Sequence, residues 1–191
     1  LNWLCTSLSK VRRLIEDAHN PAVLLTTGGM APIHIGHLEM MEKARLAAEA
    51  AGHTVVGGFI SPDHDEYTDQ KLGSRMFPAS IRVQLVARAT QNSSWLDVDP
   101  WAALHVSGSV NFTDVVERLR LYIRHHLHRD ITVIYVCGGD NARFASCFLK
   151  EGHCCVVSRP GGEGELEKAR IDPLNLGNPR ILWARSTLEA S

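Results

Sequence analysis

His34 and His37 lie at the end of a glycine-rich segment, TGGMAPIHIGH. Gly28 and Gly29 lack side chains and can bring backbone amides close to a ligand. Gly36 and His37 begin a predicted helix, whose free N–H groups and positive dipole end attract a polyphosphate. The two imidazoles add donors on the same side of the turn, able to hold phosphate oxygens as charge develops during a displacement. The segment therefore predicts a phosphate-binding site.

The rest of the chain must form the elements that position this segment. Apolar residues at steps of three and four predict an amphipathic helix over residues 2–18 that packs on the body of the domain. Helical patterns also cover residues 36–51, 80–89, 112–128 and 141–150, and strand patterns cover residues 22–27, 54–60, 95–99, 131–136, 153–158 and 181–184. Residues 61–77 are expected to be a polar loop, and residues 159–179 an irregular stretch, either a loop over the site or a surface excursion.

The repeated order of strand and then helix predicts an α/β fold. We expect a Rossmann-like, doubly wound parallel sheet with helices on both faces, in a single domain over residues 1–191. Ligands of such sheets bind beyond the carboxyl ends of the strands. Gly28 and Gly138 both fall at such ends, so the two turns are expected to share one site.

Composition narrows the classes of partner. Twenty Lys and Arg stand against 21 Asp and Glu, which gives no general electrostatic reason to expect nucleic acid or an anionic membrane. No apolar run is long enough to span a membrane, and the first residues lack the layout of a signal peptide, so we expect a soluble, cytoplasmic protein. The five cysteines include no CxxC pair, which favours reduced thiols, with Cys154 and Cys155 in the core.

The pattern His34-Ile-Gly-His37, between a predicted strand and a predicted helix, resembles the signature of the HxGH nucleotidylyltransferase superfamily. Class I aminoacyl-tRNA synthetases share this pattern. A chain of 191 residues leaves no room for their tRNA-binding domain, and no KMSKS-like segment is present.

Further motifs resemble the nicotinamide mononucleotide adenylyltransferases. They are Ile60-Ser-Pro-Asp-His-Asp-Glu-Tyr67, Arg82 followed by Asn92-Ser-Ser-Trp-Leu-Asp-Val-Asp-Pro-Trp101, Cys137-Gly-Gly-Asp-Asn141 and Val157-Ser-Arg-Pro-Gly161. The resemblance spans roughly residues 22–161 and implies transfer of AMP from ATP to the mononucleotide, with release of pyrophosphate. It implies Mg²⁺ held by the ATP phosphates and water rather than by protein ligands.

The resemblance also implies roles for individual residues. His34 and His37 are the implied catalytic pair. The implied ATP-binding residues are Gly28, Gly29, Met30, Gly36, Gly138, Gly139, Asp140 and Arg159, with Asp140 accepting hydrogen bonds from the ribose. The implied acceptor-binding residues are Tyr67, Lys71, Arg82, Trp95 and Asn141.

Two of these residues have alternative interpretations. Trp95 either stacks on a pyridine ring or packs in the core, and Trp101 is expected to be structural. Arg82 either pairs with a phosphate or fixes the site through a buried ion pair. The sequence does not decide between them.

The chain also departs from the family. Consecutive lysines that hold the acceptor's phosphate are reduced to Lys71, and the second aromatic clamp is absent, although Phe144 or Phe148 could replace it if it is not a core residue. The C-terminal ISSTxxR motif is incomplete: Ser186-Thr187 has no arginine at the required spacing, and we expect a phosphate-binding helix to be missing from the chain after Ser191.

These departures leave other functions open. A nucleotidylyltransferase acting on a different phosphorylated small molecule is one alternative, and a non-catalytic nucleotide-binding module is another. A homo-oligomer is also open. His125, His126 and His128 could suggest zinc, but histidines near the end of a helix suit its negative dipole end. The carboxylates of residues 63–69 are expected to form a solvated acidic loop, and we expect no metal bound by protein ligands.

Overall fold

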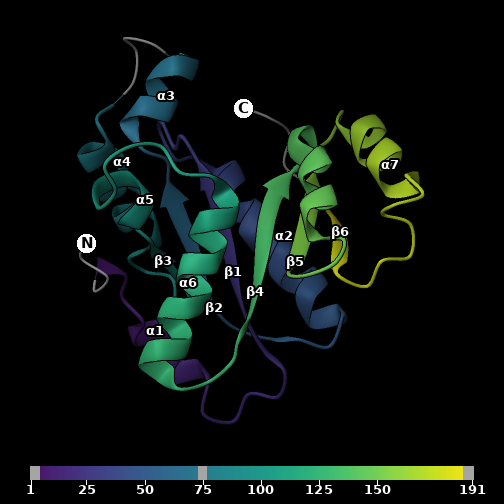
Figure 1. Ribbon diagram of the computed structural model, residues 1–191, viewed down its shortest axis with the longest axis horizontal. Coiled ribbons are helices and arrows are strands. Elements are labelled where there is room, and N and C mark those ends of the chain that lie inside the picture. The colour runs from purple at the N-terminus through teal and green to yellow at the C-terminus, as the bar shows by residue number, and fades with distance from the viewer. Residues whose placement is uncertain (1–4, 73–76, 187–191) are drawn as a thin grey trace.

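The sheet is built from six parallel strands in a computed structural model that describes residues 5–72 and 77–186. The strand order is β3-β2-β1-β4-β5-β6 (Figure 1). The strands are β1 (Pro21–Gly28), β2 (Thr54–Pro62), β3 (Leu96–Val98), β4 (Thr132–Gly138), β5 (His153–Ser158) and β6 (Ile181–Arg185). This is the order of a doubly wound Rossmann sheet, which confirms the predicted fold class.

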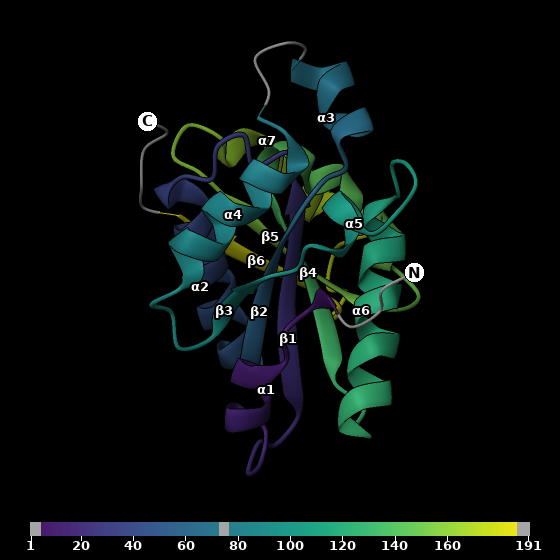
Figure 2. The same cartoon turned by 90° about the vertical axis from the view of Figure 1, so that its left-hand side faces the viewer.

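Helices cover both faces of the sheet, as the alternating pattern predicted. α2 (Ile35–Ala50) and α4 (Ala79–Thr90) pack on one face, and α1 (Ser9–Leu14), α5 (Trp101–Leu104) and α6 (Phe112–Leu127) pack on the other. Figure 2 shows α4 and α6 on opposite sides of the strands. The second face also carries the 3₁₀ helix η3 (Gly139–Phe148) and α7 (Glu163–Ile171).

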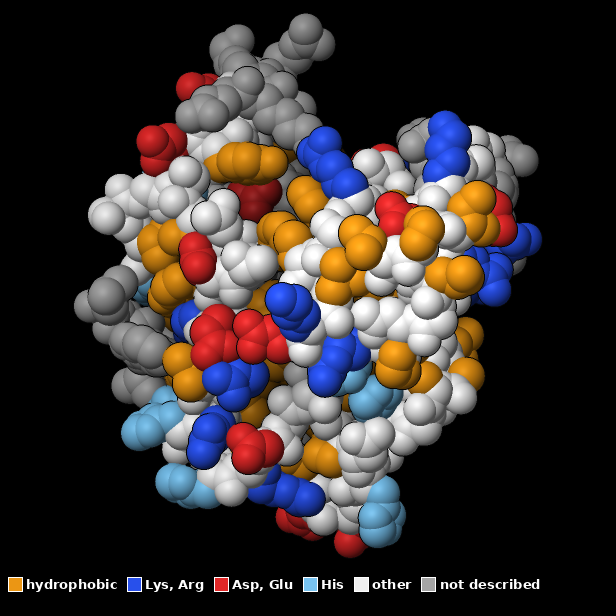
Figure 3. Space-filling view, turned by 45° about the vertical axis from the view of Figure 1, so that its right-hand side comes forward, with side chains coloured by type: hydrophobic (Ala, Val, Ile, Leu, Met, Phe, Trp, Pro, Cys, Tyr) orange, Lys and Arg blue, Asp and Glu red, His pale blue; other side chains and the backbone are white. Residues whose placement is uncertain are grey.

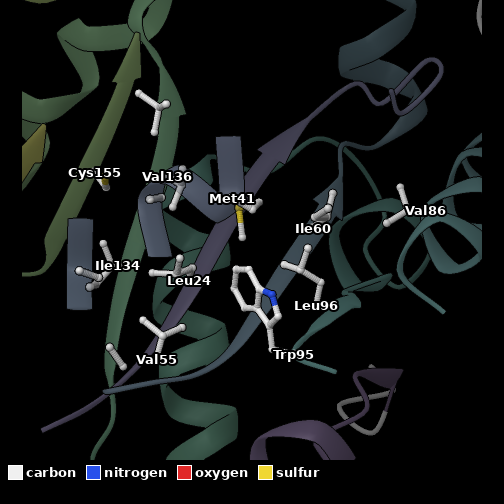
Figure 4. Packing of buried hydrophobic residues seen from close by; sticks show 14 of the residues in the cluster. Leu24, Met41, Val55, Ile60, Val86, Trp95, Leu96, Ile134, Val136 and Cys155 are labelled. Atoms are coloured by element: carbon white, nitrogen blue, oxygen red, sulfur yellow. The ribbon is translucent and has the colours of Figure 1, made fainter. Parts of the chain in front are cut away.

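The core between α2, α4 and the sheet consists of apolar side chains from every layer. Met41 of α2 and Leu24 of β1 are fully buried there, beside the indole of Trp95 (Figure 4). β1 and β4 are almost wholly apolar in their centres because strands of a parallel sheet are buried on both faces. The two threonines and the glycine of β1 and the glycine of β4 lie at the carboxyl ends, where the chain leaves the sheet.

Four sequence predictions about elements need correction. The first helix covers only Ser9–Leu14 of the expected residues 2–18, of which residues 2–4 lie outside the described part of the chain. Within the expected polar loop, α3 forms over Asp65–Leu72, and α7 forms in the expected irregular stretch. The expected helix over residues 141–150 is instead η3, which begins at Gly139, directly after β4.

Other expectations about side chains are confirmed. All five cysteines are free thiols, and Cys154 and Cys155 have no exposed surface. Phe148 is buried and Phe144 packs against the same cluster, as expected for residues that pack on a core. His125 and His126 lie in the last turn of α6. None of the helices in the described ranges has both the length and the apolar character that crossing a membrane requires.

Charged side chains are mixed rather than segregated on the face of the molecule that Figure 3 shows. Acidic and basic groups alternate there, with apolar side chains scattered among them. This mixture matches the near balance of charge in the sequence, 20 Lys and Arg against 21 Asp and Glu. On that face, the described residues form no broad area of a single sign that would attract a polyanion.

Candidate active site

A cavity of about 210 Å³ lies at the carboxyl ends of β1 and β4. These two strands form the point at which the strand order reverses, the usual ligand crevice of this sheet. Most of the predicted site residues line the cavity: Gly28, Gly29, Met30, His34, Gly36, His37, Gly138, Asp140, Asn141 and Arg159. Both glycine turns therefore meet in one place, as the sequence predicted.

His34 and His37 form a closely spaced pair at the start of α2. Their ring centroids lie 3.9 Å apart. Nδ1 of His34 accepts the backbone N–H of Gly36 at 3.1 Å, and Nδ1 of His37 accepts the backbone N–H of His34 at 3.2 Å. Because each Nδ1 is an acceptor, each neutral ring carries its proton on Nε2. The pair therefore offers two Nε2–H donors, and His34 at the same time caps α2.

The glycine between the two histidines leaves room for the first imidazole. A Cβ added to Gly36 would lie 3.0 Å from Cε1 and 3.1 Å from Nδ1 of His34. These contacts are shorter than ordinary van der Waals contacts, so a side chain at this position would require the ring to shift by a few tenths of an ångström. Glycine at this position of the pattern His-x-Gly-His thus fits the space that the first ring occupies.

Burial first, and then the nearby His34 and Arg159, together lower the pKa of His37 from 6.5 to about 4. At neutral pH His37 is therefore uncharged and donates from Nε2 as a neutral imidazole. An anionic ligand would reverse the balance, because a polyphosphate beside the ring stabilises the imidazolium. The ring can therefore gain positive character as negative charge builds on a bound phosphate.

The opposite wall comes from the ends of β4 and β5. Gly138 and Asp140 follow β4, and Arg159 follows β5 with its guanidinium 3.7 Å from the Asp140 carboxylate. A Cβ on Gly138 would lie 2.5 Å from Oδ1 of Asp140, so a side chain at this position would require the Asp140 carboxylate to move. Gly139 is buried against Ser158, beneath the cavity rather than in its lining. This wall presents one carboxylate and one guanidinium to a ligand.

Arg82, predicted from the sequence to bind the acceptor or to form a buried ion pair, is a buried structural residue. Its guanidinium has no exposed surface and forms an ion pair with Asp65 at 2.7 Å. It also donates to the carbonyl oxygens of Gly29, Asp63 and Phe77 at 2.7, 2.8 and 2.9 Å. Of the two interpretations, the structure therefore shows the buried ion pair: four of the five N–H donors bond within the protein, and the side chain has no exposed surface for a substrate.

Trp95 likewise lies in the core rather than in the cavity. Only 3% of its surface is exposed, and its Nε1 donates to Glu42 at 2.8 Å. Figure 4 shows the indole beside Met41 and Leu96. The stacking role that sequence reasoning assigned to Trp95 is therefore corrected, since no ring face is open to a ligand. Trp101 is partly buried against the other core and lies beside Arg118.

Two further predicted residues belong to α3. Tyr67 is 48% exposed and does not line the cavity. Lys71 lies in the last turn of α3, but its side chain falls outside the described part of the structure. The acidic residues expected in a solvated loop stand at the start of α3 instead: Asp65 pairs with Arg82, and Glu66 accepts the N–H of Ser109 at 3.0 Å. The acceptor side is thus the part on which sequence and structure differ most.

The comparisons with known proteins agree with this geometry. A sequence model described as cytidylyltransferase-like matches residues 25–157, which include both glycine turns and both histidines. The chain belongs to the cytidylyltransferase-like family.

Proteins named nicotinamide/nicotinic acid mononucleotide adenylyltransferase are similar to this cytidylyltransferase-like chain. One from Caenorhabditis elegans, with the suffix 2, is 31% identical over 129 residues, or 68% of this chain and 56% of that protein. One from Arabidopsis thaliana is 32% identical over 121 residues, or 62% of this chain and 49% of that protein. One from Xenopus tropicalis, again with the suffix 2, is 39% identical over 89 residues, or 46% of this chain and 28% of that protein. The chain thus covers about half or less of their lengths.

Several residues of this cytidylyltransferase-like site were not predicted. Thr27, Tyr135 and Ser186 all line the cavity. The Tyr135 hydroxyl lies 3.1 Å from Oγ1 of Thr27, and Ser186 is hydrogen-bonded to Glu39 of α2. Thr27 could have been found from its position directly before Gly28. Tyr135 gave no such signal, because a tyrosine within a β-rich apolar run is typical of a strand core.

Proposed function

We propose that this chain transfers the AMP part of ATP to the phosphate of nicotinamide mononucleotide or a close analogue. An oxygen of the acceptor's phosphate attacks the α-phosphorus of ATP, and a new P–O bond forms. The bond from the α-phosphorus to the bridging oxygen breaks, and pyrophosphate leaves with the electron pair. The products are a dinucleotide such as NAD and pyrophosphate.

The observation that carries this proposal is the pair of Nε2–H donors of His34 and His37 in the cavity at the start of α2. An ionised phosphate needs no general base, so the site's task is to position two anions and to stabilise charge. The positive dipole end of α2 and the two imidazoles do this together. The names of the similar proteins support AMP transfer as the reaction.

We assign the nucleoside of ATP to the wall formed by Gly138, Asp140 and Arg159, with Gly139 buried in the same turn and the ribose hydroxyls on the Asp140 carboxylate. In the described ranges, no three His, Cys, Asp or Glu side chains converge as a metal site. We propose that Mg²⁺ is held by the ATP phosphates and water, since Mg²⁺ gives up its bound water reluctantly. The ion would neutralise phosphate charge, while the protein's own residues orient the two substrates.

Pyrophosphate release with ATP and a panel of phosphorylated acceptors tests the proposal, with the dinucleotide product identified by mass spectrometry. We expect turnover with nicotinamide or nicotinic acid mononucleotide. Turnover only with another acceptor would show that AMP transfer is the right reaction and that the mononucleotide is the wrong acceptor. Other acceptors are included because Arg82 and Trp95, both predicted to bind the mononucleotide, are buried. ATP binding without turnover on any acceptor would refute the enzymatic assignment.

A further inference from the structure

Two hydroxyl groups meet on the floor of the cavity, where β1 and β4 are neighbours. Thr27 is the second-last residue of β1 and Tyr135 lies in the middle of β4, and their hydroxyl oxygen atoms are 3.1 Å apart. Both residues line the cavity. The phenol ring itself is buried, stacked 4.6 Å from the ring of Phe112, which in turn lies 4.7 Å from Phe144. The stack fixes the ring, so the hydroxyl is a rigidly placed polar group.

The pair has a definite hydrogen-bonding capacity. Two hydroxyls carry two protons, and one of these is used in the bond between them. Whichever oxygen donates, the pair presents one remaining O–H donor and at least one free lone pair to the cavity. A primary carboxamide matches this, because it offers one carbonyl oxygen and one NH₂ group side by side. A carboxylate offers two acceptors, so one of its oxygens would face a lone pair.

The electrostatic surroundings favour a neutral group as well. Burial raises the pKa of Tyr135, so its hydroxyl stays protonated at neutral pH. The only Lys or Arg among the described residues that line the cavity is Arg159, which lies beside Asp140 on the opposite wall. A carboxylate on the floor would therefore lose its water without gaining a cation.

The position of the pair assigns it to the acceptor. If the nucleoside of ATP occupies the wall of Asp140 and Arg159, and its phosphates lie at His34 and His37, the floor around Thr27 is left for the other substrate. We infer that the hydroxyl pair of Thr27 and Tyr135 recognises the carboxamide of the acceptor's ring and disfavours the carboxylate form. This inference rests on the proposed function and adds the choice between its two acceptors.

The test compares kcat/KM for nicotinamide mononucleotide with that for nicotinic acid mononucleotide. In the wild type we expect the amide form to be preferred by about tenfold or more, the effect of one unmade buried hydrogen bond. Tyr135→Phe and Thr27→Val each remove one hydroxyl and keep the side chain's shape. Each should reduce the preference to about threefold or less, mainly by lowering kcat/KM for the amide form, while the KM for ATP stays within about twofold.

Two matched variants control for the loss of a hydroxyl elsewhere. Tyr122→Phe removes the bond to the carbonyl of Thr6, and Thr90→Val removes the bond to the carbonyl of Val86. Neither residue lines the cavity, so both variants should keep the wild-type preference. A wild-type ratio near one, or an unchanged ratio in Tyr135→Phe, would overturn the inference while leaving AMP transfer intact. A raised KM for ATP with an unchanged ratio would place the adenine on the hydroxyl pair and also overturn it. No turnover with either mononucleotide would refute the proposed function itself.

Discussion

Replacing His37 with alanine separates the contribution of this residue to chemistry from its contribution to folding. The substitution removes one Nε2–H donor from the cavity and leaves the helix start, His34 and Arg159 in place. Loss of one donor that stabilises developing charge lowers kcat by about 10²-fold or more, equivalent to about 3 kcal/mol. We expect an effect of this size at saturating ATP and acceptor.

The structural cost of the same substitution is much smaller. The ring accepts one backbone hydrogen bond, from the N–H of His34 at 3.2 Å, as half of the capping box of α2. Losing such a bond costs about 1 kcal/mol. For a domain of this size that amounts to about 2–4 °C in Tm. The loss in activity should therefore exceed the loss in stability by a wide margin.

The assay is pyrophosphate release, measured with a thermal melt of the same preparation. His125→Ala provides the control, because His125 is exposed in the last turn of α6 and does not line the cavity. That variant should keep kcat within about twofold of the wild type. If His37→Ala is folded and its kcat lies within threefold of the wild type, the assignment of His37 to charge stabilisation is wrong.

Three other predictions concern stability and the geometry of the site. The pKa of His37, about 4 when folded against 6.5 when unfolded, means that the unfolded chain binds more protons between these values. The free energy of unfolding therefore falls as pH drops through this window. Between pH 7 and pH 4, chemical denaturation should show that the wild type loses up to about 3 kcal/mol more of this free energy than His37→Ala. Equal losses in the two proteins would contradict the pKa shift. Gly36→Ala should keep the fold but lower kcat by about tenfold or more, since the new Cβ displaces the ring of His34; unchanged turnover would show that the ring has room. Arg82→Met should lower the free energy of unfolding, measured by urea denaturation, by about 3 kcal/mol or more, and Asp65→Asn should lower it clearly less. The reason is that the Arg82 side chain is fully buried and that of Asp65 is 44% exposed. The reverse order would refute the account of the ion pair.

The parts of the site that lie close together in the chain could be predicted from the sequence. His34, Gly36 and His37 act within one turn, so their spacing alone shows that they share a helix start. The same holds for Gly138 and Asp140 after β4. The doubly wound parallel sheet followed from the alternation of apolar runs and helical patterns, because crossovers of one hand leave few arrangements.

The parts that depend on distant contacts could not be predicted. Arg82 is typical of a substrate-binding cation until the fold brings three carbonyl groups and a carboxylate around it. Thr27 and Tyr135 are 108 positions apart, and only the pairing of β1 with β4 joins their hydroxyls. The two missed helices, α3 and α7, are rich in charged residues and lack a strong apolar face, so their periodicity gave no clear signal.

The central claim, that a polyphosphate is held by two imidazoles at the start of α2, can be tested by ¹⁵N NMR of the histidine side chains with and without ATP. In the free protein, His34 and His37 should both show the Nε2–H tautomer, with the pKa of His37 near 4. ATP should shift the Nε2 signals of both rings and raise the pKa of His37, because phosphate oxygens stabilise the imidazolium. If saturating ATP leaves both rings and that pKa unchanged, the phosphates bind elsewhere and the account of the site is wrong.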